Sequence, residues 1–323
     1  MRLNSPRFKT SDDPYLKKRR RKRLALAGLL SAIVAAVAFG VPAVVRAAGH
    51  DRNSRQVIPR KADILALWER HDYKAVVSAC DLLLGQSPLD SFCLSLRGMS
   101  LFYLGIAELD SDKRVVFFDD AVFSLRKALI ADEVPLRNQN HYVLGKTYFQ
   151  KGIDYYEEAI SELEKSIVNG PVTPDAWEYL ALAAQGLSLN EKSVEYFEKA
   201  LQAFPDSAEL KAAAARSYVL LGGVADAERL ALEAYQTSTD AYLTERCAFL
   251  LGEIYRSQGR YDEALASYQT IKDKNPESAD AWYYEGLVFM ETGDPLKARA
   301  SWRKAVSIDP MHTAARQKLS ERS

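Results

Sequence analysis

The sequence predicts an all-α fold made of a repeated helical unit, and three observations lead to this prediction. First, residues of one kind recur 34 positions apart near the carboxyl terminus, and a fixed period of this size is typical of repeat proteins. The recurring pairs are Gly259 and Gly293, Ala264 and Ala298, and Pro276 and Pro310. Second, the chain beyond about residue 56 shows almost none of the apolar-polar alternation of strands. Third, the recurring proline stops a helix, because it lacks an N–H and clashes one turn back.

This stretch resembles the tetratricopeptide repeat. The pattern needs a large aromatic residue, a glycine, a second aromatic residue, a small residue in the second helix and a closing proline. They are present as Trp282, Gly286, Phe289, Ala298 and Pro310. The resemblance implies that each unit is a pair of antiparallel helices and that the pairs stack into an α-solenoid, a right-handed superhelix. It also implies that Gly286 lies where two backbones approach closely and that Trp302 fills the gap opposite.

The resemblance extends over about residues 57–321 and divides them into seven units. The expected ranges are 57–90, 91–135, 136–171, 172–206, 207–240, 241–277 and 278–311, followed by a capping helix and tail at 312–323. The second unit runs about 11 residues too long, and the extra piece includes the apolar residues from Val115 to Phe118. A longer helix pair that buries these side chains on the next repeat would explain them. A protrusion that contacts a partner is the alternative.

The amino-terminal part differs in composition from the rest. Residues 1–23 carry ten Lys or Arg against two Asp, with an unbroken basic run from Lys17 to Arg23. Residues 24–45 contain no charged residue, and as a helix they would span about 33 Å, against roughly 30 Å of bilayer hydrocarbon. We therefore expect a basic cytoplasmic tail at 1–23, one transmembrane helix at 24–45 and a linker at 46–56.

The distribution of positive charge predicts the orientation of this helix. Lys and Arg on its amino side predict that the amino terminus is cytoplasmic and that the repeats lie beyond the membrane. In a bacterium this is a single-pass inner-membrane protein with its repeat body in the periplasm. A cleaved signal peptide is the alternative, with a potential cleavage site at Val45-Arg46-Ala47. The apolar run is longer than that of a typical signal peptide, which favours the uncleaved anchor.

Charge and missing motifs argue against two classes of function. Beyond residue 23 the chain has 33 Lys or Arg against 41 Asp or Glu, so an acidic body does not suit nucleic acid. No phosphate-binding glycine loop, G-x-S-x-G turn or zinc-ligand spacing is present. Ser301 and Lys304 form an S-x-x-K match, which we interpret as part of a solvated helix face. We expect no enzyme activity, no cofactor and no metal.

The three cysteines are too few for a disulfide scaffold. We interpret Cys80, Cys93 and Cys247 as small buried apolar residues. Cys80 and Cys93 belong to adjoining helices of the repeat arrangement, so a bond between them stays open.

The resemblance also implies where a partner binds, because the first helix of each unit forms the inner wall of the stacked array. Carried over by position, the candidate partner-binding residues are Tyr142, Lys146, Tyr179, Arg216, Phe249, Arg256, Tyr283 and Tyr284. Arg246 and Glu253 occupy the same wall. Tyrosine and arginine dominate binding hot spots, so we expect this groove to hold an extended or helical segment of another protein. Packing between neighbouring helices is the alternative role for the aromatic residues.

A clamp of Lys, Asn and Arg for a terminal carboxylate, found in chaperone-binding members of the family, is missing. The matching places hold Ser95, Met99, Val143, Asp175 and Tyr179. The sequence therefore predicts a membrane-tethered scaffold or assembly factor that mediates protein–protein interactions in the periplasm. A cleaved soluble periplasmic chaperone or adaptor, or a structural subunit of an envelope machine such as a spirochaete flagellar collar, is the alternative. Self-association stays open.

Overall fold

The computed structural model describes residues 58–131, 133–168 and 173–321. The chain divides into two units, Met1–Ile58 and Pro59–Ser323, and the second contains nearly all of these residues. The expected tail at 1–23, transmembrane helix at 24–45 and linker at 46–56 lie outside the described residues, as does Pro171. Among the residues that are described, no helix combines the length and the apolar character needed to cross a membrane.

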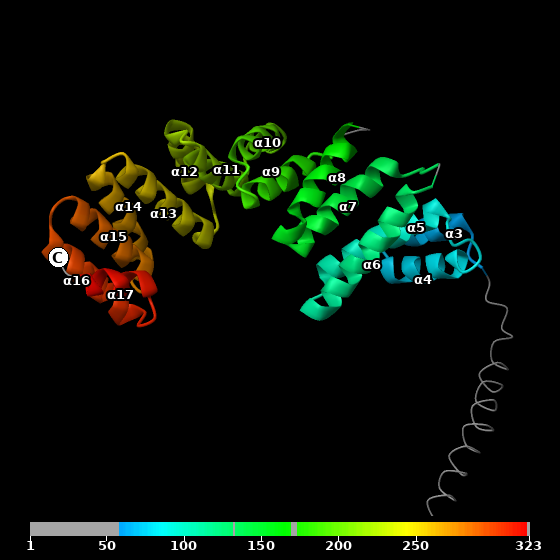
Figure 1. Ribbon diagram of the computed structural model, residues 1–323, viewed down its shortest axis with the longest axis horizontal. Coiled ribbons are helices and arrows are strands. Elements are labelled where there is room, and N and C mark those ends of the chain that lie inside the picture. The colour runs from blue at the N-terminus through cyan, green and yellow to red at the C-terminus, as the bar shows by residue number, and fades with distance from the viewer. Residues whose placement is uncertain (1–57, 132, 169–172, 322–323) are drawn as a thin grey trace, which may run out of the picture. The chain divides into compact units, whose positions relative to one another are not determined.

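The expectation of an all-α repeat fold is confirmed. Residues 58–131, 133–168 and 173–321 contain fifteen α-helices, one short 3-10 helix and no strand. Figure 1 shows the helices following one another in chain order from α3 to α17. Their bounds are α3 (Lys61–Glu69), α4 (Tyr73–Leu84), α5 (Ser91–Ala107), α6 (Ser111–Leu129), α7 (Arg137–Lys151), η3 (Ile153–Tyr155), α8 (Tyr156–Val168), α9 (Ala176–Gly186), α10 (Asn190–Ala203), α11 (Ala208–Leu221), α12 (Val224–Thr237), α13 (Ala241–Ser257), α14 (Tyr261–Lys274), α15 (Ala279–Glu291), α16 (Pro295–Ile308) and α17 (Thr313–Ser320).

Consecutive helices pack as hairpins, from α3–α4 to α15–α16. The second helix of each hairpin also packs against the first helix of the next one, so the main contacts stay between neighbours, as in other repeat arrays. Helix α17 packs on α16, where Ala315 is buried and the Arg299 guanidinium donates to the Leu319 carbonyl at 3.0 Å. The unit boundaries within the connecting segments, and the hand of the superhelix, stay predictions.

The expected pairing of a small residue with a large one is confirmed at two hairpin crossings. A Cβ atom on Gly286 would lie 2.4 Å from Nε1 of Trp302, and one on Gly252 would lie 2.5 Å from Cε1 of Tyr268. Both aromatic side chains are fully buried. The two crossings are 34 residues apart, so the period of the sequence marks the places where only glycine lets the helices approach.

Two other members of the period end helices. Gly259 and Gly293 follow α13 and α15 with φ of 72° and 82°, in the left-handed region that favours glycine. Pro276 and Pro310 lie two residues beyond the ends of α14 and α16. A proline there cannot continue the preceding helix, so each hairpin ends at the same point of the repeat.

The long second unit fits neither expectation alone. Phe118 of α6 is buried, and a Cβ atom on Gly105 of α5 would lie 2.6 Å from its ring. Val115 and Val116, one turn earlier, are exposed. The extra residues therefore lengthen a helix pair and bury one aromatic ring within that pair, but they also leave apolar side chains at its end.

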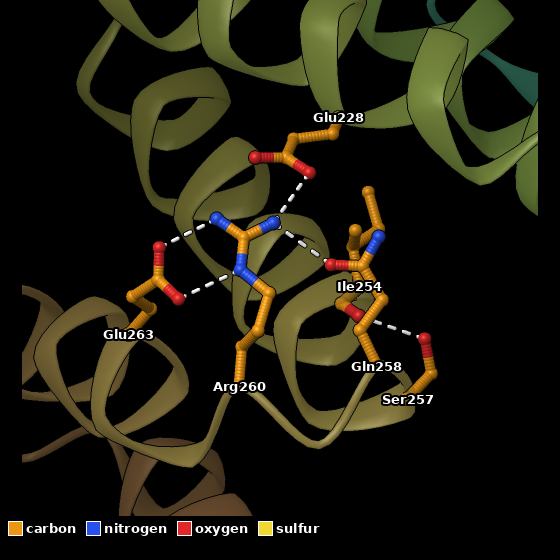
Figure 2. Close-up of polar contacts among 6 residues, drawn as sticks. All are labelled: Glu228, Ile254, Ser257, Gln258, Arg260 and Glu263. Atoms are coloured by element: carbon orange, nitrogen blue, oxygen red, sulfur yellow. Dashed lines mark hydrogen bonds and ion pairs between the residues drawn. The ribbon is translucent and has the colours of Figure 1, made fainter.

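Arg260 ties two hairpins together at the start of α14. Figure 2 shows its guanidinium between the carboxylates of Glu228 and Glu263. Nη1 donates to Glu228 on α12 at 2.6 Å, and Nε donates to Glu263 on α14 at 2.7 Å. The guanidinium also lies over the ring of Tyr255, 4.3 Å from its centroid. One arginine thus joins α12, α13 and α14.

The interpretation of Ser301 as part of a solvated face is wrong. Its side chain is buried, and its hydroxyl donates to Oε2 of Glu285 at 2.8 Å. Glu285 also pairs with Lys272, whose side chain is only 6% exposed. Ala298, Ser301, Trp302 and Ala305 of α16 have the spacing of one helix face, and that face packs on α15. The serine belongs to the core because its neighbours along this face do.

The interpretation of the cysteines is confirmed. Cys80, Cys93 and Cys247 are buried free thiols. Burial raises the pKa of Cys247 to about 11. A hydrogen bond between the thiols of Cys80 and Cys93, together with burial, raises the pKa of Cys80. The two side chains are therefore neighbours across α4 and α5, and no bond joins them in this structure.

Candidate functional site

A groove of about 740 Å³ runs over the first helices of neighbouring hairpins. It is lined from α9, α11, α13 and α15, and three of the residues expected to bind a partner line it. These are Arg216 of α11, Phe249 of α13 and Tyr284 of α15. Their common position follows from the repeat, because equivalent places of successive first helices face the same side of the stack.

Apolar side chains in this groove are exposed to solvent. The side chain of Leu220 in α11 is 54% exposed and that of Tyr242 in α13 is 68% exposed. Val219 is exposed as well, and Leu243 and Leu250 line the same groove. Soluble monomers rarely expose contiguous apolar surface without a use for it, so this surface is a candidate contact for another protein.

Helix α11 explains why these side chains are exposed. Its buried face is built from small residues such as Ala214 and Ala215, with Leu210 near its start. The run from Tyr218 to Leu221 adds four apolar residues in a row, more than one face of a helix can bury. Tyr218 turns toward α10, where its hydroxyl donates to Glu198 at 2.6 Å, and Leu220 is left in the groove.

The aromatic part of the groove is held in place by packing. Phe249 lies at 5.8 Å between ring centroids from Tyr284, which stacks on the buried ring of Tyr268 at 5.7 Å. Burial, followed by the charge of Glu253, raises the pKa of Tyr284 to about 12. The Tyr284 hydroxyl therefore stays protonated near neutral pH and can donate to Glu253. These rings form a preorganised surface that loses little side-chain entropy when a partner binds.

A second group of expected residues lies between α7 and α9. Tyr142 donates to Asp175 at 2.7 Å, and Nζ of Lys146 donates to Tyr142 at 2.9 Å and to Asp175 at 3.0 Å. The same ammonium lies 4.6 Å from the ring centroid of Tyr179. Burial raises the pKa of Tyr142. Burial alone would lower the pKa of Lys146, but its bonds to Tyr142 and Asp175 outweigh that effect and raise it.

The last two expected residues contact their own chain. Arg256 of α13 forms an ion pair with Glu291 of α15. Tyr283 packs against His312, with 5.1 Å between ring centroids, and His312 Nε2 lies 3.1 Å from Asp280. Neither Arg256 nor Tyr283 lines the groove over α9 to α15. Their role in partner binding stays a prediction.

Position in the repeat did not identify the exposed apolar residues of the groove. Leu220 and Tyr242 lie outside the places that the family resemblance supplied. The apolar run at the end of α11 was the available signal, since it exceeds what one buried face needs. In the part of the chain that the structure describes, no three His, Cys, Asp or Glu side chains come together as a metal site would require.

The fold and the groove define a class of protein, a helical-hairpin repeat protein of the kind that binds other proteins. Residues 154–208, 212–275 and 249–311 match the sequence profile of the tetratricopeptide repeat. The matched part of the chain belongs to the tetratricopeptide repeat family. The groove lies mostly within this part, since α9, α11, α13 and α15 all fall between residues 154 and 311.

Two curated proteins are similar in sequence to part of this chain. A TPR repeat-containing protein of Methanocaldococcus jannaschii is 25% identical over 177 residues, which is 53% of this chain and 29% of the relative. The BBSome complex member BBS4 homolog of Drosophila melanogaster is 26% identical over 130 residues, which is 40% of this chain and 26% of the relative. The chain therefore spans less than a third of the length of these curated relatives.

One solved structure shows the same fold over most of the chain. It is the carboxyl-terminal part of a TPR repeat-containing protein from Cytophaga hutchinsonii, with a TM-score of 0.59 and 12% sequence identity. The similarity covers 81% of this chain and 100% of that one. At this identity the comparison shows the fold alone.

Proposed function

We propose that this protein is a membrane-tethered scaffold or assembly factor that holds a segment of another protein in the groove over α9 to α15. The observation that carries the proposal is the exposure of Leu220 and Tyr242 in a groove whose aromatic part is already packed in place. The tetratricopeptide repeat fold mediates contacts between proteins, which supports the same conclusion.

The tether and the location rest on the amino-terminal sequence. The uncharged run at 24–45 after the basic run Lys17 to Arg23 supports one membrane-spanning helix. In this proposal the amino terminus lies in the cytoplasm and the repeats lie in the periplasm of a bacterium. Protease added to spheroplasts should then digest the repeats and leave the amino-terminal tail intact. Protection of the repeats until the inner membrane is broken would contradict this placement.

Whether the amino-terminal segment is cleaved distinguishes the membrane-tethered protein from the soluble alternative. Amino-terminal sequencing of the mature protein should find residues 1–23 still attached. A mature terminus near Ala47 would instead favour a soluble periplasmic chaperone or adaptor. The identity of the bound protein decides whether the chain serves an envelope machine, since the fold supplies a surface and not a particular process.

A matched pair of variants tests the groove itself. Leu220→Asp places a charge in the groove, whereas Leu232→Asp places it on α12, a second helix, where Leu232 is 38% exposed and lies outside the groove. The bound protein is first identified by affinity capture from solubilised membranes and then purified for titration. We expect Leu220→Asp to weaken its binding at least about tenfold and Leu232→Asp to leave it unchanged. Equal affinity of both folded variants would contradict the proposal.

Alanine variants of Tyr142, Tyr179 and Tyr283 are less suitable for this purpose. Tyr142 is part of the network with Lys146 and Asp175, and Tyr283 packs against His312. Their loss would change the stability of the array as well as its surface. The groove variants avoid this ambiguity because Leu220 is exposed in the free protein.

A further inference from the structure

Two arginines in the groove have no acidic partner. Arg216 of α11 and Arg246 of α13 line it, and both side chains are exposed. Across residues 58–131, 133–168 and 173–321, neither guanidinium forms a hydrogen bond or an ion pair with another side chain. The Arg246 guanidinium lies over the ring of Tyr242, 5.6 Å from its centroid. Two positive charges in the same groove are therefore available to a ligand.

The acidic residues of the groove are engaged by the chain itself. Asp240 caps α13 by accepting a hydrogen bond from the backbone N–H of Tyr242 at 3.0 Å. Glu209 accepts one from the Ser207 hydroxyl at 3.1 Å, in the first turn of α11. Glu253 lies beside Tyr284, and burial together with this carboxylate raises the pKa of Tyr284. Asp240 and Glu209 therefore already accept hydrogen bonds and lie at helix amino termini, which stabilise negative charge, whereas the arginines keep their full capacity to donate.

We infer that the segment bound in this groove carries carboxylate side chains next to apolar ones, so that Arg216 and Arg246 pair with acidic residues while Leu220 and Phe249 contact the apolar residues. This inference rests on the proposed function and names the chemistry of its partner. A guanidinium presents a planar fork of donors that matches a carboxylate with two parallel hydrogen bonds. A basic segment would instead place its charges against these two arginines, and Glu209 and Asp240 already accept hydrogen bonds from the chain itself.

The position of the arginines limits where the acidic residues bind. Arg216 and Arg246 belong to successive first helices, and the aromatic part with Phe249 and Tyr284 follows toward α15. A segment in this groove can therefore contact the two arginines, the apolar side chains of Leu220 and Leu243, and the aromatic rings, because all of them line it. The apolar contacts supply affinity, and the paired charges select for acidic sequences and fix the register.

The test uses a random peptide library displayed on phage and the purified full-length protein in detergent micelles. Peptides are long enough to cross two hairpins and are selected on the wild type. Synthetic copies of the selected peptides are then compared with copies in which Asp and Glu are replaced by Asn and Gln. Affinity is measured by fluorescence anisotropy on wild type, Arg216→Glu and Arg246→Glu. Arg303→Glu on α16 is the matched control, since Arg303 is exposed and lies outside the groove.

We expect enrichment of Asp or Glu beside Leu, Ile or Phe. We also expect Arg216→Glu and Arg246→Glu each to bind the acidic peptides about tenfold more weakly or worse, and the wild type to bind the Asn and Gln copies with a similar loss. Arg303→Glu should bind the acidic peptides with the affinity of the wild type. The inference would be overturned if the selected peptides showed no enrichment of Asp or Glu. It would also be overturned if acidic peptides bound Arg216→Glu and Arg246→Glu with the same affinity as the wild type. If such peptides still lose binding in Leu220→Asp, the proposed groove function stands and only the acidic chemistry fails. If no selected peptide responds to Leu220→Asp, the proposed function fails together with this inference.

Discussion

The indole of Trp302 occupies the space that a side chain on Gly286 would need, and its Nε1 donates to the backbone carbonyl of Tyr283 at 3.1 Å. One aromatic ring therefore fills the gap between α15 and α16 and also satisfies a backbone acceptor. The ring of Tyr268 fills the equivalent space over Gly252 one repeat earlier. This contact sets how closely the two helices approach in these two hairpins, which belong to the array that carries the groove.

Gly286→Ala should lower the free energy of unfolding by on the order of 2 kcal/mol, because the new Cβ would overlap the buried Trp302 ring. Alanine also favours the helix by about 1 kcal/mol, so the overlap must outweigh that gain. Urea unfolding followed by circular dichroism measures the change. Trp302→Leu should reduce the penalty of Gly286→Ala, because the two residues touch. Equal or greater stability of Gly286→Ala alone would contradict this packing.

Lys272→Met should destabilise the carboxyl-terminal repeats by about 3 kcal/mol, since it leaves the Glu285 carboxylate buried without its cation. Glu285 would keep the hydrogen bond from the Ser301 hydroxyl, which carries no positive charge. Lys113→Met is the matched control, because Lys113 pairs with Asp110 on the surface at 3.7 Å. Its loss should change the free energy of unfolding by no more than about 0.5 kcal/mol. Urea unfolding of both variants should separate them clearly. Equal effects would mean that the ion pair between α14 and α15 is as weak as the surface pair.

Acid should weaken the array partly through Asp90. This residue caps α5 by accepting from Cys93 N at 2.9 Å and pairs with Lys61 at 2.7 Å. Burial alone would raise the pKa of Asp90, but its bonds to Lys61 and Cys93 outweigh burial and hold it below 3.8. Its stabilisation is therefore present above that value and lost as the pH falls through the lowered pKa of the folded state.

Asp90→Asn isolates this contribution, because asparagine also caps helices but does not titrate. We expect the wild type to be more stable than the variant by about 1 kcal/mol near neutral pH, with the difference shrinking as the pH falls below the ordinary pKa of 3.8 and through the lowered pKa of Asp90 in the folded state. Chemical unfolding at a series of pH values measures both curves. A difference that persists at low pH would show that Asp90 acts through its shape and not through its charge.

The three thiols should resist modification in the folded protein. All three are buried, which keeps reagents from reaching them in the folded protein, and burial also raises the pKa of Cys247 to about 11. A disulfide reagent should then react with three thiols per chain after unfolding and with almost none before. Rapid reaction of one native thiol would contradict the burial. Recovery of one thiol in place of three would indicate a bond between Cys80 and Cys93.

The fold could be predicted from the sequence because its determinants are local and periodic. Gly286, Trp302 and Pro310 each occupy a fixed place in a unit of 34 residues, and each constrains a helix crossing or a helix end. Helices that are adjacent in sequence are also adjacent in space, so no distant pairing had to be known. The expected packing of Trp302 is present in the structure for this reason.

The site could be predicted only in part. Arg216, Phe249 and Tyr284 line the groove as their places in the repeat imply. The ion pair that engages Arg256 could not be predicted, because Glu291 lies 35 residues away and long charged side chains leave no periodic signal. The exposure of Leu220 depends on how much of α11 its small neighbours can bury, which is a property of packing. Ser301 is the converse case, because the sequence predicts a solvent-exposed side chain and the packing of α16 on α15 buries it.

The central claim is that a protein segment occupies the groove over α9 to α15, and site-specific photo-crosslinking in intact cells tests it most directly. A photoreactive amino acid is placed at Leu220 in the groove or at Leu232 on α12, two positions that are both exposed in the free protein. We predict one discrete protein adduct at Leu220, its loss when Arg216→Glu is added, and no adduct at Leu232. The same adducts at both positions, or none at Leu220 while a partner is captured at Leu232, would contradict the account.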